Sequence, residues 1–134
     1  MFIGNLSREK QEKFLNLAYT MVYADGRLDE MEKWAFDSFK SEIADGVDIS
    51  KAHVVDFEKA LAEFDDCTDI EKKGIFYEIY AIALVDESYP ESEKVLVDAM
   101  QKRFGVSSVK MQEMRDGLKA FVNAYSYLRK IVEN

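Results

Sequence analysis

The sequence predicts an all-α fold, a helical bundle of about six to seven helices in a single domain that spans residues 1–134. One proline and six glycines in the whole chain are too few for the many turns of an all-β fold. Apolar residues recur instead every three or four positions, the spacing of one helix face. With 48% hydrophobic and 33% charged residues, the chain has the composition of a globular domain that buries its own core.

The charge balance excludes some classes of partner. Eighteen basic residues against 26 acidic ones give a net charge of −8, which disfavours a nucleic-acid partner.

The single cysteine, Cys67, has no partner for an internal disulfide, as is usual in a reducing compartment. No stretch approaches the roughly 18 apolar residues of a membrane span, and the first residues lack the features of a signal peptide. We therefore expect a cytoplasmic protein without a membrane span.

The first helix is predicted to begin after Ser7 and to end at Asp25-Gly26, because glycine adopts the left-handed conformation that ends helices. Its predicted inner face consists of Phe14, Leu17, Ala18, Met21 and Val22.

The second helix is predicted to begin at Asp29, which forms a capping box with Glu32, and to end at Asp45-Gly46. Its predicted inner face consists of Met31, Trp34, Ala35 and Phe39. Ser50 is predicted to cap a third helix, with one apolar stripe made of Val54, Phe57, Leu61 and Phe64.

Thr68 and Glu71 predict a capping box for a fourth helix. This helix is apolar on nearly all sides from Ile75 to Val85, which is typical of the buried central element of a bundle. A fifth helix is expected to open near Pro90 and to end at Gly105. Its apolar positions are Val95, Leu96, Ala99 and Met100.

The last helix is expected to begin near Ser107, and Gly117 is a possible point of division. It carries an unbroken heptad seam, spaced alternately by three and four residues: Met111, Met114, Leu118, Phe121, Tyr125, Leu128 and Val132. We expect the seam to pack against the domain's own core. The alternative is an open seam that serves as a homodimer surface or as a groove for a partner helix.

One short phrase occurs twice in the chain, at Ala18–Glu32 and again sixty-one residues later at Ile79–Glu93. Each copy is an apolar helical run, then an aspartate, then a glutamate seven residues later in the next helix. The aligned pairs are Tyr19 with Tyr80, Asp25 with Asp86, Glu30 with Glu91, and Glu32 with Glu93. The repeat predicts two equivalent helix-turn-helix corners.

The first copy, read from Ala24 to Glu32, resembles the Ala-Asp-Gly-x-x-x-x-x-Glu signature of the tellurite-resistance TerB-like family. That family includes the middle domain of certain membrane-anchored DnaJ-type co-chaperones. The second copy, continued to Val106, is similar to the family's second signature in position and spacing. It departs at Glu87, where the family usually has glycine, and at Pro90, where Ser or Thr is common.

The resemblance covers about residues 14–106, and it implies an all-helical fold of about seven helices with pseudo-symmetric halves. It further implies a cytoplasmic protein linked to tellurite or general stress responses, sometimes associated peripherally with membrane partners. It implies no known enzymatic activity.

The two corners predict a candidate metal site. If the halves pair about a pseudo-twofold axis, five carboxylates converge: Asp25, Asp29, Glu32, Asp86 and Glu93. Oxygen ligands without His or Cys suit a hard divalent cation, calcium or magnesium. The alternative is purely structural, because acids in a first turn are favoured by the helix dipole. In that alternative, Glu91 and Glu93 belong to a solvated face, as Asp65 and Asp66 do.

The sequence lacks the residues that several common kinds of functional site require. Neither copy has the loop spacing of an EF-hand, and no Gly-rich phosphate loop is present. The only histidine, His53, lacks the Glu-x-x-His context of a di-iron bundle, and we expect it on the surface. Acidic neighbours should oppose thiolate formation at Cys67, which disfavours a catalytic cysteine.

These observations favour a non-enzymatic binding domain that takes up a divalent cation at the paired acids. The alternatives are a metal-dependent enzyme that uses the same carboxylates, and a structural dimer or protein-interaction scaffold built on the carboxy-terminal seam.

Overall fold

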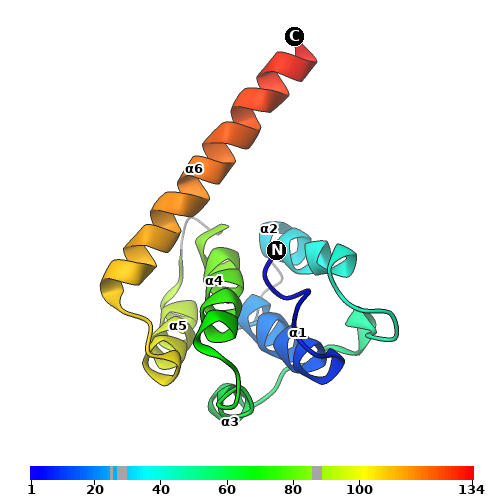
Figure 1. Ribbon diagram of the computed structural model, residues 1–134, viewed down its shortest axis with the longest axis vertical. Coiled ribbons are helices and arrows are strands. Elements are labelled where there is room, and N and C mark those ends of the chain that lie inside the picture. Colours follow the sequence, from blue (N-terminus) through cyan, green and yellow to red (C-terminus); the bar gives the residue numbers. More distant parts are fainter. Residues whose placement is uncertain (25, 27–29, 86–88) are drawn as a thin grey trace.

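The computed structural model describes residues 1–24, 26, 30–85 and 89–134. Within these ranges the chain forms six α-helices, two short 3-10 helices and no β-strand, so the all-α prediction is confirmed (Figure 1). The α-helices are α1 (Arg8–Val22), α2 (Glu30–Asp37), α3 (Phe57–Ala62), α4 (Asp69–Val85), α5 (Glu91–Phe104) and α6 (Ser108–Glu133). The 3-10 helices are Ser38–Ser41 and Ile49–Lys51.

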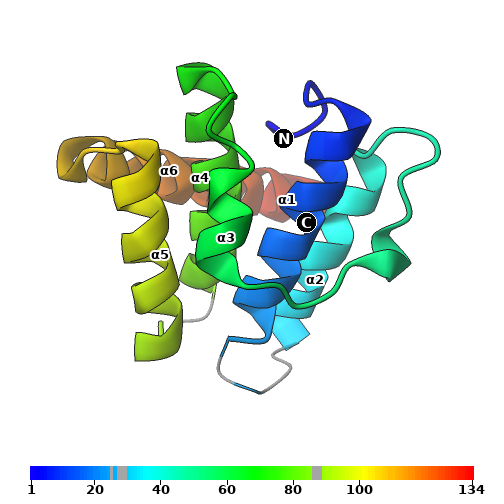
Figure 2. The same ribbon diagram turned by 90° about the horizontal axis from the view of Figure 1, so that it is seen from below.

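Helix α4 is the centre of the bundle, as its apolar sequence predicts. It packs against α1, α2 and α5, and the short α3 packs across α1 and α5 (Figure 2). Its side chains Ile75, Phe76 and Ile79 have no exposed surface. Across from them, the rings of Phe14 and Phe39 meet edge to face with centroids 5.0 Å apart. Burial of these large side chains provides most of the driving force for folding.

Helix α1 begins after Ser7 as predicted, and it ends at Val22, three residues before the predicted Asp25-Gly26. The Ser7 hydroxyl caps it by accepting a hydrogen bond from the backbone N–H of Lys10 at 3.2 Å. All five predicted inner residues are buried, namely Phe14, Leu17, Ala18, Met21 and Val22.

The prediction for the inner face of the second helix is wrong for Met31 and Trp34, which are 54% and 68% exposed, and is confirmed for Phe39, which is buried. Ala35 packs partly buried against the core, and Glu32 and Phe36 face inward although the prediction did not include them. The buried positions follow the spacing i, i+4, i+7, so the helical period is respected. The error arose because the first inward position is occupied by the carboxylate of Glu32. The apolar side chains of Met31 and Trp34 therefore indicated the neighbouring face of the helix instead. Helix α2 also ends earlier than predicted, at Asp37.

The predicted start of the third helix is also wrong. The Ser50 hydroxyl hydrogen-bonds the Asp48 carboxylate at 2.6 Å within a 3-10 turn, and Val54 is 59% exposed. Helix α3 begins later, where the Asp56 carboxylate accepts from the Lys59 N–H at 3.1 Å. The remaining stripe residues are buried as predicted: Phe57, Leu61 and Phe64.

The predicted capping box of α4 is confirmed by its two reciprocal bonds. The Thr68 N–H donates to Glu71 Oε1 at 2.9 Å, and the Glu71 N–H donates to Thr68 Oγ1 at 3.1 Å. Helix α5 follows Pro90 and ends at Gly105, whose φ of +68° is the left-handed C-cap expected of glycine.

Helix α6 differs from both expectations. It is one continuous helix capped by Ser107, so Gly117 does not divide it. Its first turns lie beside the bundle, but every residue after Leu118 is exposed, and the helix projects away from the other five (Figure 1). The expectation that the whole seam packs against the domain's own core is therefore wrong from Phe121 onward.

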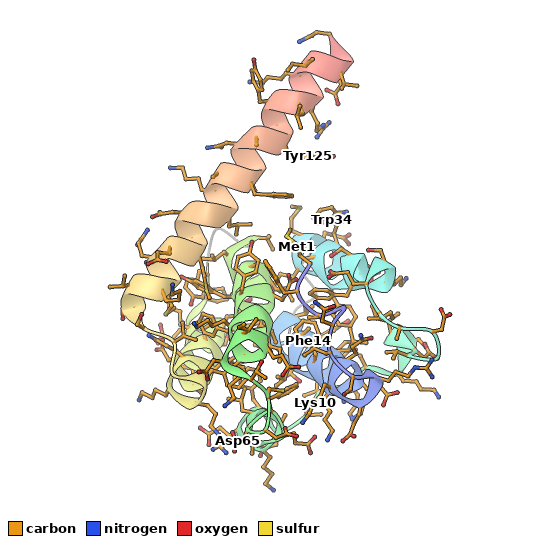
Figure 3. All side chains as sticks on the ribbon, viewed as in Figure 1. Met1, Lys10, Phe14, Trp34, Asp65 and Tyr125 are labelled. Carbon is orange, nitrogen blue, oxygen red and sulfur yellow. The ribbon has the colours of Figure 1, made fainter. Side chains whose placement is uncertain are left out.

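Ion pairs join the segment between α3 and α4 to helices α1 and α5. Lys10 on α1 donates to the Asp66 carboxylate at 2.6 Å, and Lys13 pairs with Glu63 at 2.7 Å. On the other side, Arg103 of α5 forms a bidentate pair with Asp65 (Figure 3 labels Lys10 and Asp65). These exposed aspartates lie on a solvated surface, as predicted.

None of the helices in the described ranges is long and apolar enough to cross a membrane.

Candidate functional site

The two copies of the repeated phrase lie at one end of the bundle. Figure 2 shows the carboxy-terminal ends of α1 and α4 and the amino-terminal ends of α2 and α5 together at its lower edge. Each copy thus runs along one helix toward this end and along the next helix away from it.

Two candidate ligands are buried at this end. Glu32, in the first turn of α2, has 0% of its surface exposed, and Glu93, in the first turn of α5, has 1%. Their neighbours in the same turns, Glu30 and Glu91, are exposed. The assignment of Glu93 to a solvated face is therefore wrong, and that of Glu91 is confirmed.

Burial of these two carboxylates distinguishes them from ordinary first-turn acids. A helix amino terminus carries a partial positive charge of roughly +0.5, which favours an anion there even at the surface. A carboxylate removed from water additionally requires close hydrogen bonds or a counter-charge. The equivalent glutamates of both copies are buried alike, which suits a function shared by the two turns.

The other three candidate ligands, Asp25, Asp29 and Asp86, lie outside the described residues, and so does the predicted capping bond of Asp29 to Glu32. Among the residues that the structure describes, no three His, Cys, Asp or Glu side chains are grouped so that they would hold a metal ion.

Tyr89 is a neighbour of Glu93 that sequence reasoning missed. Its backbone has φ +36°, a left-handed value that non-glycine residues rarely adopt. Burial raises the pKa of its hydroxyl to about 12, with smaller contributions from Tyr80, Asp98 and Glu93. The phenol therefore stays protonated and uncharged beside the buried carboxylate at neutral pH.

The paired tyrosines of the repeat have different surroundings. Tyr80 is 2% exposed, and its hydroxyl accepts a hydrogen bond from the Arg115 guanidinium of α6. Tyr19 is half-buried, with its ring 4.4 Å from that of Tyr23 and 5.8 Å from that of Phe36. The second corner is thus tied to α6, a contact that the repeat alone does not predict.

Each turn contains a described residue with a left-handed backbone. In the first copy Gly26, immediately after the repeat aspartate, has φ +74°, and in the second copy Tyr89, immediately before Pro90, has φ +36°. The positions that align with these two in the other copy, Glu87 and Leu28, lie outside the described residues.

The two residues with other reactive side chains lie elsewhere. His53 is exposed, as predicted, with Nδ1 3.1 Å from the Lys51 carbonyl oxygen. The pKa of the Cys67 thiol is raised, chiefly by burial and next by the Glu71 carboxylate. This direction agrees with the expectation that thiolate formation is opposed there.

A separate apolar pocket of about 440 Å³ opens between the amino-terminal segment, α4 and the base of α6. Its described lining is Met1, Phe2, Ile70, Lys73, Gly74, Tyr77, Met114, Gly117 and Phe121. Neither buried glutamate lines it, so this pocket and the acidic end of the bundle are distinct features.

No protein-family model matches the chain, and searches of curated proteins and of solved structures also found no match. The resemblance to the TerB-like family therefore remains a prediction from the two signatures.

Proposed function

We propose that the chain is a non-enzymatic binding domain that takes up a divalent cation, calcium or magnesium, between its two acidic turns. The observation that supports this most is the full burial of Glu32 and Glu93, at equivalent positions of the repeat and at the same end of the bundle. In the proposal, Asp25, Asp29 and Asp86 supply further oxygens.

The donor chemistry fits a hard cation. Calcium binds six to eight oxygen ligands and magnesium about six, and carboxylates are the ligands that both prefer. The two glutamates lie where water does not screen a charge, which increases the gain from binding a cation to their carboxylate forms. The positive helix amino termini favour the same carboxylates, so the ion and the helix dipoles share in stabilising them.

Kinship with the TerB-like family is part of the proposal. In support, α1 with α2 and α4 with α5 each form a helix-turn-helix corner, and both corners open at the same end. On this basis the domain has two pseudo-symmetric halves and acts in a tellurite or general stress response. A cytoplasmic setting, with peripheral attachment through a membrane partner, follows from the same kinship.

The test is a titration of the chelator-treated protein with calcium or magnesium, followed by thermal unfolding and calorimetry. A cation present at one hundred times its dissociation constant should stabilise the folded state by about 2.7 kcal/mol. We expect Glu32→Gln, Glu93→Gln and the double variant Asp25→Asn, Asp86→Asn to lose the cation-dependent rise in melting temperature.

Matched controls are available in the same first turns. Glu30→Gln and Glu91→Gln remove the same charge from exposed positions, and both variants should keep the response to the cation. A parent protein that shows no shift with either ion contradicts the proposal. A shift that is equal in all variants places the ion elsewhere on the molecule.

The alternative of a metal-dependent enzyme uses the same carboxylates. It needs an open site in which substrate reaches the ion, whereas Glu32 and Glu93 have almost no exposed surface. This burial favours binding over catalysis as the role of the site.

A further inference from the structure

The projecting part of α6 carries an apolar stripe that nothing in the bundle covers. The stripe consists of Phe121, Tyr125, Leu128 and Val132, which are 56%, 59%, 58% and 82% exposed. Val122 and Ile131 flank it and are 50% and 56% exposed. These six side chains lie along one helix over three turns, and Figure 3 shows Tyr125 on this segment beyond the bundle.

The stripe is large by the standards of a monomer. From their exposed fractions, the six residues present on the order of 700 Å², given that aromatic side chains bury 150–250 Å² each. The largest apolar patch of a typical monomer is about 300–600 Å². A stable interface buries about 800 Å² on each partner. The stripe with the adjoining pocket is therefore of the size that one side of an interface requires.

The stripe continues into the apolar pocket at the base of the same helix. Phe121 belongs to both, and Met114 and Gly117 line the pocket on the side of α6. One face of α6 thus has exposed apolar side chains near its tip and an apolar hollow near its base. A partner helix that fits the whole face has to carry the complementary arrangement, with its own apolar side chains over the hollow.

We propose that the partner is a second copy of this chain, with the two α6 helices packed antiparallel about a twofold axis. An unbroken three-four spacing packs best against a helix with the same spacing, and α6 itself has it. Antiparallel packing pairs the seam residues reciprocally: Met114 with Val132 of the second copy, Leu118 with Leu128, and Phe121 with Tyr125. All four stripe residues are then covered, and each tip lies over the other copy's pocket.

Charge supports the same arrangement. Residues 108–134 contain five basic and three acidic side chains, so residues 1–107 contain 13 basic and 23 acidic ones and carry a net charge of −10. Antiparallel packing moves each α6 tip, with Arg129 and Lys130, toward the acidic bundle of the other copy. Opposite charge on the two surfaces steers such an encounter.

Parallel packing satisfies these observations less well, because it would leave both pockets uncovered and would keep both α6 tips away from the acidic bundles. In the antiparallel arrangement the small residues Gly117 and Ala124 lie along one flank of the seam and allow close approach of the helices.

The first test is the mass of the full chain in solution, measured by light scattering after size exclusion over a series of concentrations. The parent should have twice the mass of the chain, and Tyr125→Glu, Leu128→Glu should shift it to the monomer. The matched control, Asn123→Glu, Ser126→Glu, adds the same charge to the opposite, exposed face and should remain a dimer. Circular dichroism checks that all three proteins are helical.

Cysteine cross-linking tests the direction of packing, in a background of Cys67→Ser. A mixture of Leu118→Cys and Leu128→Cys should form a disulfide dimer on oxidation, whereas either variant alone should not. Cross-linking of each variant with itself would overturn the antiparallel arrangement. A parent that stays monomeric at all concentrations, or a dimer unaffected by Tyr125→Glu, Leu128→Glu, would overturn the proposal as a whole.

Discussion

Gln11 is the residue that joins the amino-terminal segment to the bundle. It is 1% exposed on α1, and its side-chain amide donates to the Leu6 carbonyl at 3.0 Å and to those of Ile3 and Gly4 at 3.4 Å. Its Oε1 accepts from the Ala44 N–H at 2.7 Å. One buried amide thus satisfies backbone groups from two irregular segments that have no regular secondary structure to do so.

We expect Gln11→Met to lower the free energy of unfolding by about 2–3 kcal/mol. Methionine has a similar shape but cannot hydrogen-bond the part-buried Ala44 N–H or the Leu6 carbonyl, and loss of such partners costs about 1–3 kcal/mol for a buried group. Urea unfolding measures the change. The control Gln112→Met, at an exposed glutamine of α6, should stay within about 0.5 kcal/mol of the parent. An equal loss in both would show that the burial of Gln11 is not the cause.

At the scale of single residues, the sequence predicted burial correctly where apolar side chains followed one helical face. It failed where an apolar residue is exposed and an acidic residue is buried. Phe14 and Leu17 are buried as predicted, whereas Trp34 is exposed and Glu32 is buried. A carboxylate inside the bundle violates the hydrophobic pattern, and such violations are common at functional or strained sites. The repeat pointed to Glu32 and Glu93 as a pair, although nothing in the pattern indicated their burial.

At the scale of the element, helix ends were predictable where a local signal was strong. Ser7, Ser107 and the Thr68 and Glu71 pair cap their helices as expected, since each forms its bonds within three residues. The prediction for Ser50 failed because Asp56, nearer to the apolar run, caps α3 instead. The exposure of α6 was not predictable, because a heptad seam has the same sequence whether it faces its own core or another chain.

Substitution of two glycines tests the end of α5 and the continuity of α6. Gly105 has φ +68° and Gly117 is helical, and an added Cβ would meet no atom within 4 Å at either position. Gly105→Ala should therefore destabilise the protein by about 1 kcal/mol through backbone strain alone. Gly117→Ala should stabilise it by roughly 0.5–1 kcal/mol, because glycine is a poor helix former.

Both substitutions are best measured in the variant Tyr125→Glu, Leu128→Glu, so that an α6 interface does not contribute. Chemical unfolding gives the two free energies. Changes of the same sign would contradict the assignment of Gly105 to a left-handed cap and Gly117 to a helix interior.

At the scale of the whole molecule, the bundle and the α6 tip are separable. The described core lies in the amino-terminal segment with Ile3 and Leu6, in α1 to α5 and the segments between them, and in Val106, and no residue beyond Leu118 is buried. Deletion of residues 122–134 should therefore leave the melting temperature of the dilute protein within about 2 °C of the parent's monomer. The deleted protein should also be monomeric at every concentration. Loss of cooperative unfolding would show that the tip contributes to the core.

The projection of α6 has a consequence for how this chain completes its folding. A helix segment of about 12–15 residues without neighbours is only marginally stable in water, and the tip beyond Leu118 is of that length. Its amide protons in a lone copy should therefore exchange with solvent almost as fast as those of an unfolded peptide. In the proposed dimer, the second molecule orders this last part of the secondary structure, so the concentration of the protein would govern how much of its own chain is folded.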